Sequence, residues 1–76
     1  MPRPKSAANQ AVGKAIRKAR EQAGHTQESF AAAAEIDRSY YGAVERGEFN
    51  LSVDTVKKIA TALDMTAAEL FERAKI

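Results

Sequence analysis

The stretch that decides the fold, residues 24–47, reads GHTQESFAAAAEIDRSYYGAVERG. Thr26 and Asp37 each stand before a run of helix-forming residues, and their side-chain oxygens can accept a hydrogen bond from a backbone N–H of the first helical turn. Gly47 can end a helix, since glycine adopts the left-handed conformation at no steric cost. The stretch therefore predicts two short helices, one running to about Ala34 and the next ending at Gly47.

Three further helices are expected outside this stretch. The first runs from about Ala8 to Gly24, with apolar residues at steps of four, three and four: Val12, Ile16, Ala19 and Ala23. Ser52 can cap another helix, whose predicted apolar stripe is Val53, Val56, Ile59, Ala60 and Leu63. Thr66 and Glu69 have the spacing of a capping box at the start of the last helix. No segment alternates between apolar and polar residues, so the expected fold class is all-α, with five helices.

The composition excludes several classes of protein. The 76 residues include no cysteine and one histidine, so thiolate and multi-histidine metal sites are excluded, and no nucleophile or acid–base set can be assembled. We therefore expect no enzyme, no metal and no cofactor. No apolar run approaches the roughly 18 residues of a membrane span, and no apolar segment follows the basic N-terminus as in a secretory signal, so a cytoplasmic protein is expected. Residues 1–8 are expected to form a flexible basic arm, and residues 9–76 a single domain.

The charge is unevenly distributed along the chain. Residues 1–24 carry six basic side chains and one acidic, a net charge of +5, whereas residues 25–76 carry six basic and nine acidic, a net charge of −3. A basic segment on an acidic body indicates a polyanionic partner, because binding to phosphates releases counterions. The alternative is an ordinary solvated helix face, and charge alone does not decide between the two.

Several motifs together resemble one family. The stretch from Gly24 to Gly47, with Asn50-Leu51-Ser52-Val53 after it, resembles the helix-turn-helix of the Xre/Cro, lambda-repressor-like family. The resemblance covers roughly residues 10–72. Residues 36–41, Ile-Asp-Arg-Ser-Tyr-Tyr, also resemble the recognition helix of restriction–modification controller proteins. The resemblance implies a regulator that places the helix after Asp37 in the major groove of double-stranded DNA.

The resemblance also implies roles for individual residues. Arg38 can bind O6 and N7 of guanine through two hydrogen bonds, and Ser39 can reach a base or a phosphate. Asp37 is either a helix cap or an acceptor for cytosine N4. Contacts to the DNA backbone are expected from four further residues: Gln27, Tyr40, Asn50 and Arg17. For each of these residues, the alternative is an ordinary surface or capping side chain.

Other residues are expected to serve the structure. In the family, the residues that match Arg20 and Glu45 form an ion pair that ties the first helix to the third, and Tyr41 falls at a core position. Glu35 and Asp64 stand where the family usually has glycine. A residue other than glycine in a left-handed turn costs about 1 kcal/mol, so this chain departs from the usual turn without excluding it.

The expected function is that of a transcriptional regulator that binds an inverted-repeat operator as a homodimer. Only eighteen apolar residues are larger than alanine, so the core is thin, and Leu70 and Phe71, with Ile76 nearby, are expected to contact a second copy. Two alternatives stay open: the antitoxin of a toxin–antitoxin pair, which also binds a protein toxin, and a helical protein-interaction module without DNA binding.

Overall fold

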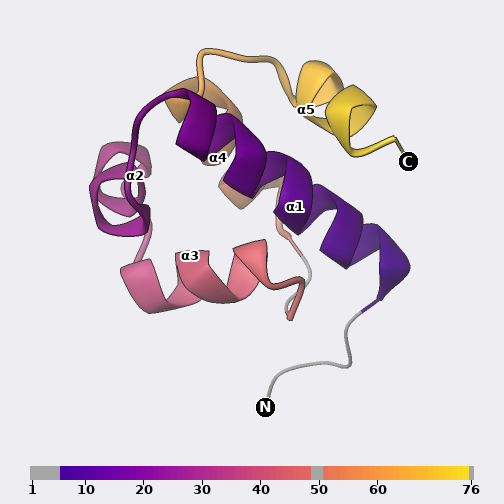
Figure 1. Cartoon of the computed structure of the whole chain (residues 1–76), viewed down its shortest axis with the longest axis horizontal. Helices are drawn as coiled ribbons and strands as arrows, with labels where there is room; N and C mark the ends of the chain where they lie inside the picture. Colours follow the sequence, from indigo (N-terminus) through magenta and orange to yellow (C-terminus); the bar gives the residue numbers. More distant parts are fainter. Residues whose placement is uncertain (1–5, 49–50, 76) are drawn as a thin grey trace.

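The computed structural model describes residues 6–48 and 51–75, and within them it contains five α-helices and no strand. The helices are α1 (Ala7–Gln22), α2 (Gln27–Ala34), α3 (Arg38–Glu45), α4 (Val53–Ala62) and α5 (Ala67–Ala74) (Figure 1). The predicted all-α fold with five helices is therefore confirmed. Helix α1 begins at Ala7, so the end of the expected flexible arm belongs to the helix and its cap; residues 1–5 lie outside the described residues.

Each helix begins at a residue whose side chain accepts a hydrogen bond from the backbone N–H three residues later. The predicted caps are confirmed at Thr26, Asp37, Ser52 and Thr66, and Ser6 caps α1 in the same way. Thr66 forms the predicted capping box with Glu69. These bonds satisfy backbone donors that have no partner within a helix, which explains why the helices start where they do.

Left-handed residues end the helices and turn the chain. Glu35 (φ 58°) follows α2, and Asp64 (φ 58°) follows α4, at the two positions where the family usually has glycine. The turn after Glu35 lets the N–H of Ile36 reach back to the carbonyl of Ala31 at 2.9 Å, which closes the end of α2. Glutamate therefore adopts the standard turn between α2 and α3, at a cost of about 1 kcal/mol relative to glycine.

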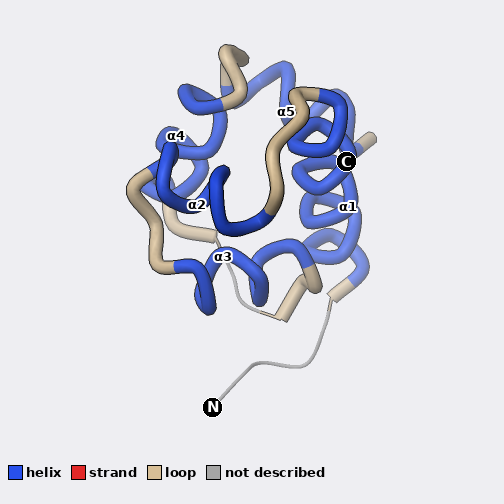
Figure 2. The backbone as a smooth tube through the Cα atoms, turned by 60° about the vertical axis from the view of Figure 1, so that its left-hand side comes forward, coloured by secondary structure: helices blue, strands red, loops and turns tan. Residues whose placement is uncertain are grey.

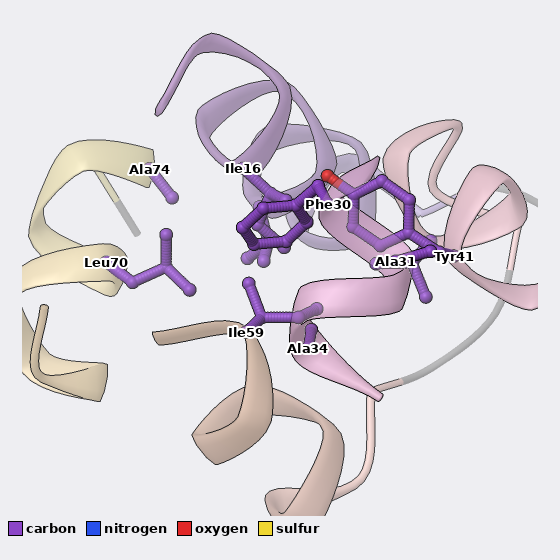
Figure 3. Close-up of a cluster of buried hydrophobic side chains, with 10 residues drawn as sticks. Ile16, Phe30, Ala31, Ala34, Tyr41, Ile59, Leu70 and Ala74 are labelled. Atoms are coloured by element: carbon purple, nitrogen blue, oxygen red, sulfur yellow. The ribbon is translucent and has the colours of Figure 1, made fainter. Parts of the chain in front are cut away.

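Every helix contributes a large, fully buried side chain to the core, namely Ile16, Phe30, Tyr41, Ile59 and Leu70, and α3 adds Val44 as a second. Figure 3 shows these side chains gathered in one cluster, with Ala31, Ala34 and Ala74 around them. Helix α1 packs against α5 and α3, and α2 packs against α3 and α4 (Figure 2). The core position predicted for Tyr41 is confirmed. All five helices depend on one small cluster, so no helix is independent of the rest.

Three sequence-based expectations for apolar residues were wrong. Leu70 was expected to contact a second copy, but it is fully buried in the core of its own domain, because α5 packs on α1 with this side chain inward. Val53 was placed on the buried stripe of α4, but it is 76% exposed, because it is the first residue of the helix and extends beyond the core. Ala23 is exposed because it caps the end of α1.

Candidate nucleic-acid interface

The exposed first turn of α3 follows the left-handed turn at Glu35. Asp37, Arg38 and Ser39 are all exposed there. One carboxylate oxygen of Asp37 accepts the backbone N–H of Tyr40 at 3.1 Å, so Asp37 acts as the cap of α3. This bond fixes the backbone of the first turn, and with it the positions from which the next two side chains project.

Arg38 differs from the other arginines that the structure describes. Arg17, Arg20, Arg46 and Arg73 each donate to a side chain of the protein: Glu21, Glu45, Glu48 and Gln22, respectively. Arg38 makes no hydrogen bond or ion pair with any residue in the described part of the chain. An arginine side chain has five donors in a planar fork, and here none of the five is bonded to a described residue. Arg38 is therefore free to bind a ligand.

Glu45, at the end of α3, is the acceptor for three neighbouring side chains. Arg20 donates to both of its carboxylate oxygens, from Nε at 2.7 Å and from Nη2 at 3.2 Å. Gln27 donates from Nε2 at 2.9 Å, and the hydroxyl of Tyr41 donates to Oε2. Arg20 also donates to the backbone carbonyl of His25 at 2.9 Å. This cluster joins α1, α2, α3 and the loop between the first two helices, so it sets how α3 lies against α2.

The charges in this cluster support one another. Burial alone would raise the pKa of Glu45, but the hydrogen bonds from Arg20, Tyr41 and Gln27 outweigh it and hold the pKa below its usual value. The hydrogen bond to Glu45 raises the pKa of Arg20. Burial and the hydrogen bond to Glu45 raise the pKa of the Tyr41 hydroxyl. At neutral pH the cluster therefore contains one carboxylate, one guanidinium and one neutral phenol.

Sequence reasoning found part of this cluster. It paired Arg20 with Glu45, but it assigned Gln27 either to the DNA backbone or to a helix cap, and Tyr41 to the core. The four-residue spacing between Tyr41 and Glu45 was a usable signal, because side chains at that spacing meet on a helix. Gln27 and Glu45 lie on different helices, and no local pattern connects them.

The other expected backbone contacts occupy different environments. Tyr40 is half-buried and packs against the core. Arg17 is exposed and pairs with Glu21 at 3.4 Å. Asn50 lies outside the described residues. Arg17 and Tyr40 thus lie on different helices, α1 and α3.

A shallow hollow lies between α1 and the end of α3. Its lining includes three cationic side chains, Lys14, Arg17 and Arg46, together with Gln10 and Glu45. Arg46 was not among the residues predicted to bind DNA. The signal was its position eight residues after Arg38, a spacing that places both on one face of a helix. Cations therefore flank both ends of α3.

A second hollow is apolar and lies between α4 and α5. Phe71 is half-buried and lines it together with Leu51, Val53, Val56, Lys57 and Ala67. Val53 is the only large apolar side chain that is mostly exposed among the residues that the structure describes. Of the two residues expected at a dimer interface, Phe71 therefore reaches the surface and Leu70 does not.

The comparison with protein families decides the identity of the fold. The helix-turn-helix family model HTH_3 matches residues 16–70, which include the whole of α2 and α3. The chain belongs to this helix-turn-helix family. The resemblance to Xre and lambda-repressor-like proteins is confirmed.

Relatives within the helix-turn-helix family include restriction–modification controllers. Control protein C.MunI from a Mycoplasma species is 46% identical over 46 residues, which are 60% of this chain and 62% of that protein. The matched part therefore spans less than two thirds of this relative. The crystal structure of the controller protein C.AhdI from Aeromonas hydrophila has 42% identity and a TM-score of 0.83, covering 86% of this chain and 98% of that chain.

The fold also extends to a regulator of another kind. The clp gene regulator ClgR from Corynebacterium glutamicum has a TM-score of 0.86 at 26% identity, covering 95% of this chain and 92% of that chain.

None of the helices in the described part of the chain is long and apolar enough to cross a bilayer. The described His, Asp and Glu side chains form no group suited to holding a metal ion.

Proposed function

We propose that this protein is a sequence-specific transcriptional regulator that inserts α3 into the major groove and reads guanine with Arg38. The observation that carries the proposal is the guanidinium of Arg38, which has no partner among the described residues and lies at the exposed first turn of α3 in a helix-turn-helix. Guanine presents two acceptors, O6 and N7, in the major groove, and the arginine fork matches both. Ser39 lies beside Arg38 and can donate to a base or a phosphate, while Asp37 holds the turn in place.

The cluster around Glu45 supports this proposal, because a recognition helix must be held rigidly to read bases. Arg20 and Gln27 fix the end of α3 from two other helices. Gln27 uses one amide hydrogen for Glu45, and an amide group has a second, which we assign to a DNA phosphate at the N-terminus of α2. Further backbone contacts are assigned to Tyr40, Arg17 and Asn50.

The apolar hollow between α4 and α5 supports a homodimer that binds an inverted repeat. Val53 and Phe71 form an apolar surface that a second copy can cover around a two-fold axis. The domain measures 28 × 25 × 20 Å, so equivalent helices of two adjacent copies lie at a distance comparable to the roughly 34 Å of one DNA turn. Doubling the few base contacts of one α3 makes the recognised site longer and more specific.

The biological role that fits best is control of a restriction–modification system from within the cytoplasm. C.AhdI is described as a restriction–modification controller and C.MunI as a control protein, and they share 42% and 46% identity with this chain over their matched parts. The relatives are regulators rather than enzymes, and we assign no enzymatic activity to this chain.

Binding to a random-sequence duplex, followed by fluorescence anisotropy, tests the proposal. A regulator of this kind binds the random duplex weakly, with an affinity that falls steeply as salt rises. Arg38→Ala should leave that weak binding nearly unchanged, because Arg38 reads bases. A protein that binds no duplex at low salt contradicts the proposal and favours a protein-interaction module.

A further inference from the structure

Arg46 is held by a neighbouring carboxylate immediately after α3. Its Nε lies 2.9 Å from Oε2 of Glu48, and its Nη2 lies 3.1 Å from Oε1. Two parallel hydrogen bonds of this kind are also how arginine binds a phosphate group. The Arg46 side chain is 54% exposed and that of Glu48 is 27% exposed, so the pair sits at the surface and not in the core.

The position of Arg46 places this pair on the surface proposed to face DNA. A Cβ atom on Gly42 would lie 3.2 Å from Nη1 of Arg46 and 3.7 Å from Oε1 of Gln27, so both side chains cover the same part of α3. Arg38, Gly42 and Arg46 follow one another at steps of four residues, which places them on one face of the helix. Arg46 therefore continues the face that begins with Arg38.

On its other side, Arg46 lines the cationic hollow with Lys14 and Arg17. A duplex held by Arg38 would bring its negatively charged backbone toward this row of cations. Among the described cations of the row, Arg46 is the one held through two hydrogen bonds, while Arg17 makes a single longer contact with Glu21. Arg46, the cation with the strongest contact on this surface, is thus already bound by a carboxylate of the protein.

We propose that Glu48 competes with a DNA phosphate for Arg46, and that Glu48 thereby limits how tightly the protein holds DNA of any sequence. The proposal rests on the proposed function. In the free protein the carboxylate occupies the guanidinium fork, and on binding a phosphodiester replaces it. Part of the attraction between Arg46 and the phosphate is then offset by the loss of the ion pair. Because phosphates carry no sequence information, the competition acts on specific and non-specific sites alike.

A double-mutant cycle tests this competition. We compare wild type, Glu48→Gln, Arg46→Gln and the double variant on a selected operator and on a random duplex, over a series of salt concentrations. Glu48→Gln should tighten binding to both duplexes about two- to five-fold, the range that a surface ion pair supports. The slope of log K against log salt should steepen by up to about one. In the Arg46→Gln background the gain should vanish.

Glu72→Gln, on the exposed face of α5, is the control for a simple change of net charge. Equal gains from Glu48→Gln with and without Arg46, or a gain no larger than that of the control, overturn the proposal. So does an Arg46→Gln variant that binds both duplexes as wild type does. In these cases the wild type still binds DNA, and the proposed function stands. A wild type that binds no duplex contradicts the proposed function itself.

Discussion

Gly13 of α1 lies against the backbone of Glu45 at the end of α3. A Cβ atom on Gly13 would sit only 2.4 Å from the carbonyl oxygen of Glu45 and 2.6 Å from that of Val44. The two helices therefore meet backbone to backbone at this point. Arg20 follows Gly13 by seven residues, two helical turns along the same face, and it reaches the Glu45 carboxylate from there. The close contact at Gly13 sets the helix crossing on which the Glu45 cluster depends.

Gly13→Ala should destabilise the fold by about 1–3 kcal/mol, the usual cost of an added methyl group where no space exists. The obstacle is backbone, which cannot rotate away as a side chain can. A glycine to alanine change in an open helix stabilises by roughly 0.5–1 kcal/mol, so the two cases differ in sign. Urea unfolding gives the free energy directly. A variant more stable than wild type would show that the helices do not meet at Gly13.

Acid should weaken the fold in part through Glu45. Its folded pKa lies below the ordinary value of 4.5, so its contribution to stability is present above about pH 4.5 and is lost as pH falls toward the folded pKa. Glu45→Gln removes this titration. We expect wild type to lose more unfolding free energy than Glu45→Gln between about pH 7 and pH 3, although Glu69, whose pKa is also lowered, titrates in both proteins. Equal losses would mean that Glu45 is not held as a carboxylate.

Gln27→Ala should weaken binding to all DNA sequences about equally, because we assign its free amide hydrogen to a phosphate. It also removes a donor from Glu45, so a loss of stability of about 1 kcal/mol should accompany the loss of binding. Anisotropy titrations on a selected and a random duplex, with thermal melts of the same samples, separate the two effects. A change in base preference would assign Gln27 to readout instead.

Val53→Glu should leave the domain folded and the protein monomeric, because Val53 is exposed and belongs to the apolar hollow. Operator affinity should fall on the order of 100-fold as two linked half-site contacts become one. Sedimentation velocity at micromolar concentration checks the assembly. Leu70→Glu is the contrasting variant, which should unfold because Leu70 is in the core. A wild type that is already monomeric and binds one half-site tightly contradicts the dimer.

Local signals made the helices predictable, because a cap acts within one turn. Thr26, Ser52 and Thr66 bond to residues only three positions away, so short stretches of sequence reveal them. Leu70 was different. It is next to Phe71 on a helix that turns about 100° per residue, and only the packing of α5 on α1 decides which of the two faces inward.

The site shows the same division. Arg38 could be assigned from its place after the Asp37 cap, which is a local feature. The bond from Gln27 to Glu45 could not be predicted, because it joins two helices whose relative position depends on the whole core. Arg46 and Glu48 are two residues apart, so their pairing is a local feature. The position of this pair on the surface proposed to face DNA follows from the neighbouring Gly42 and Gln27, and this could not be predicted from the sequence.

Selection of bound sequences from a random DNA pool shows whether Arg38 reads guanine from α3. Wild type should enrich an inverted repeat whose half-sites are centred about 10 base pairs apart, each with a preferred guanine. Arg38→Ala should bind the selected operator about 1–3 kcal/mol more weakly and lose the preference at that guanine while keeping the others. An Arg38→Ala variant that selects the same sequences as wild type would show that Arg38 does not read guanine.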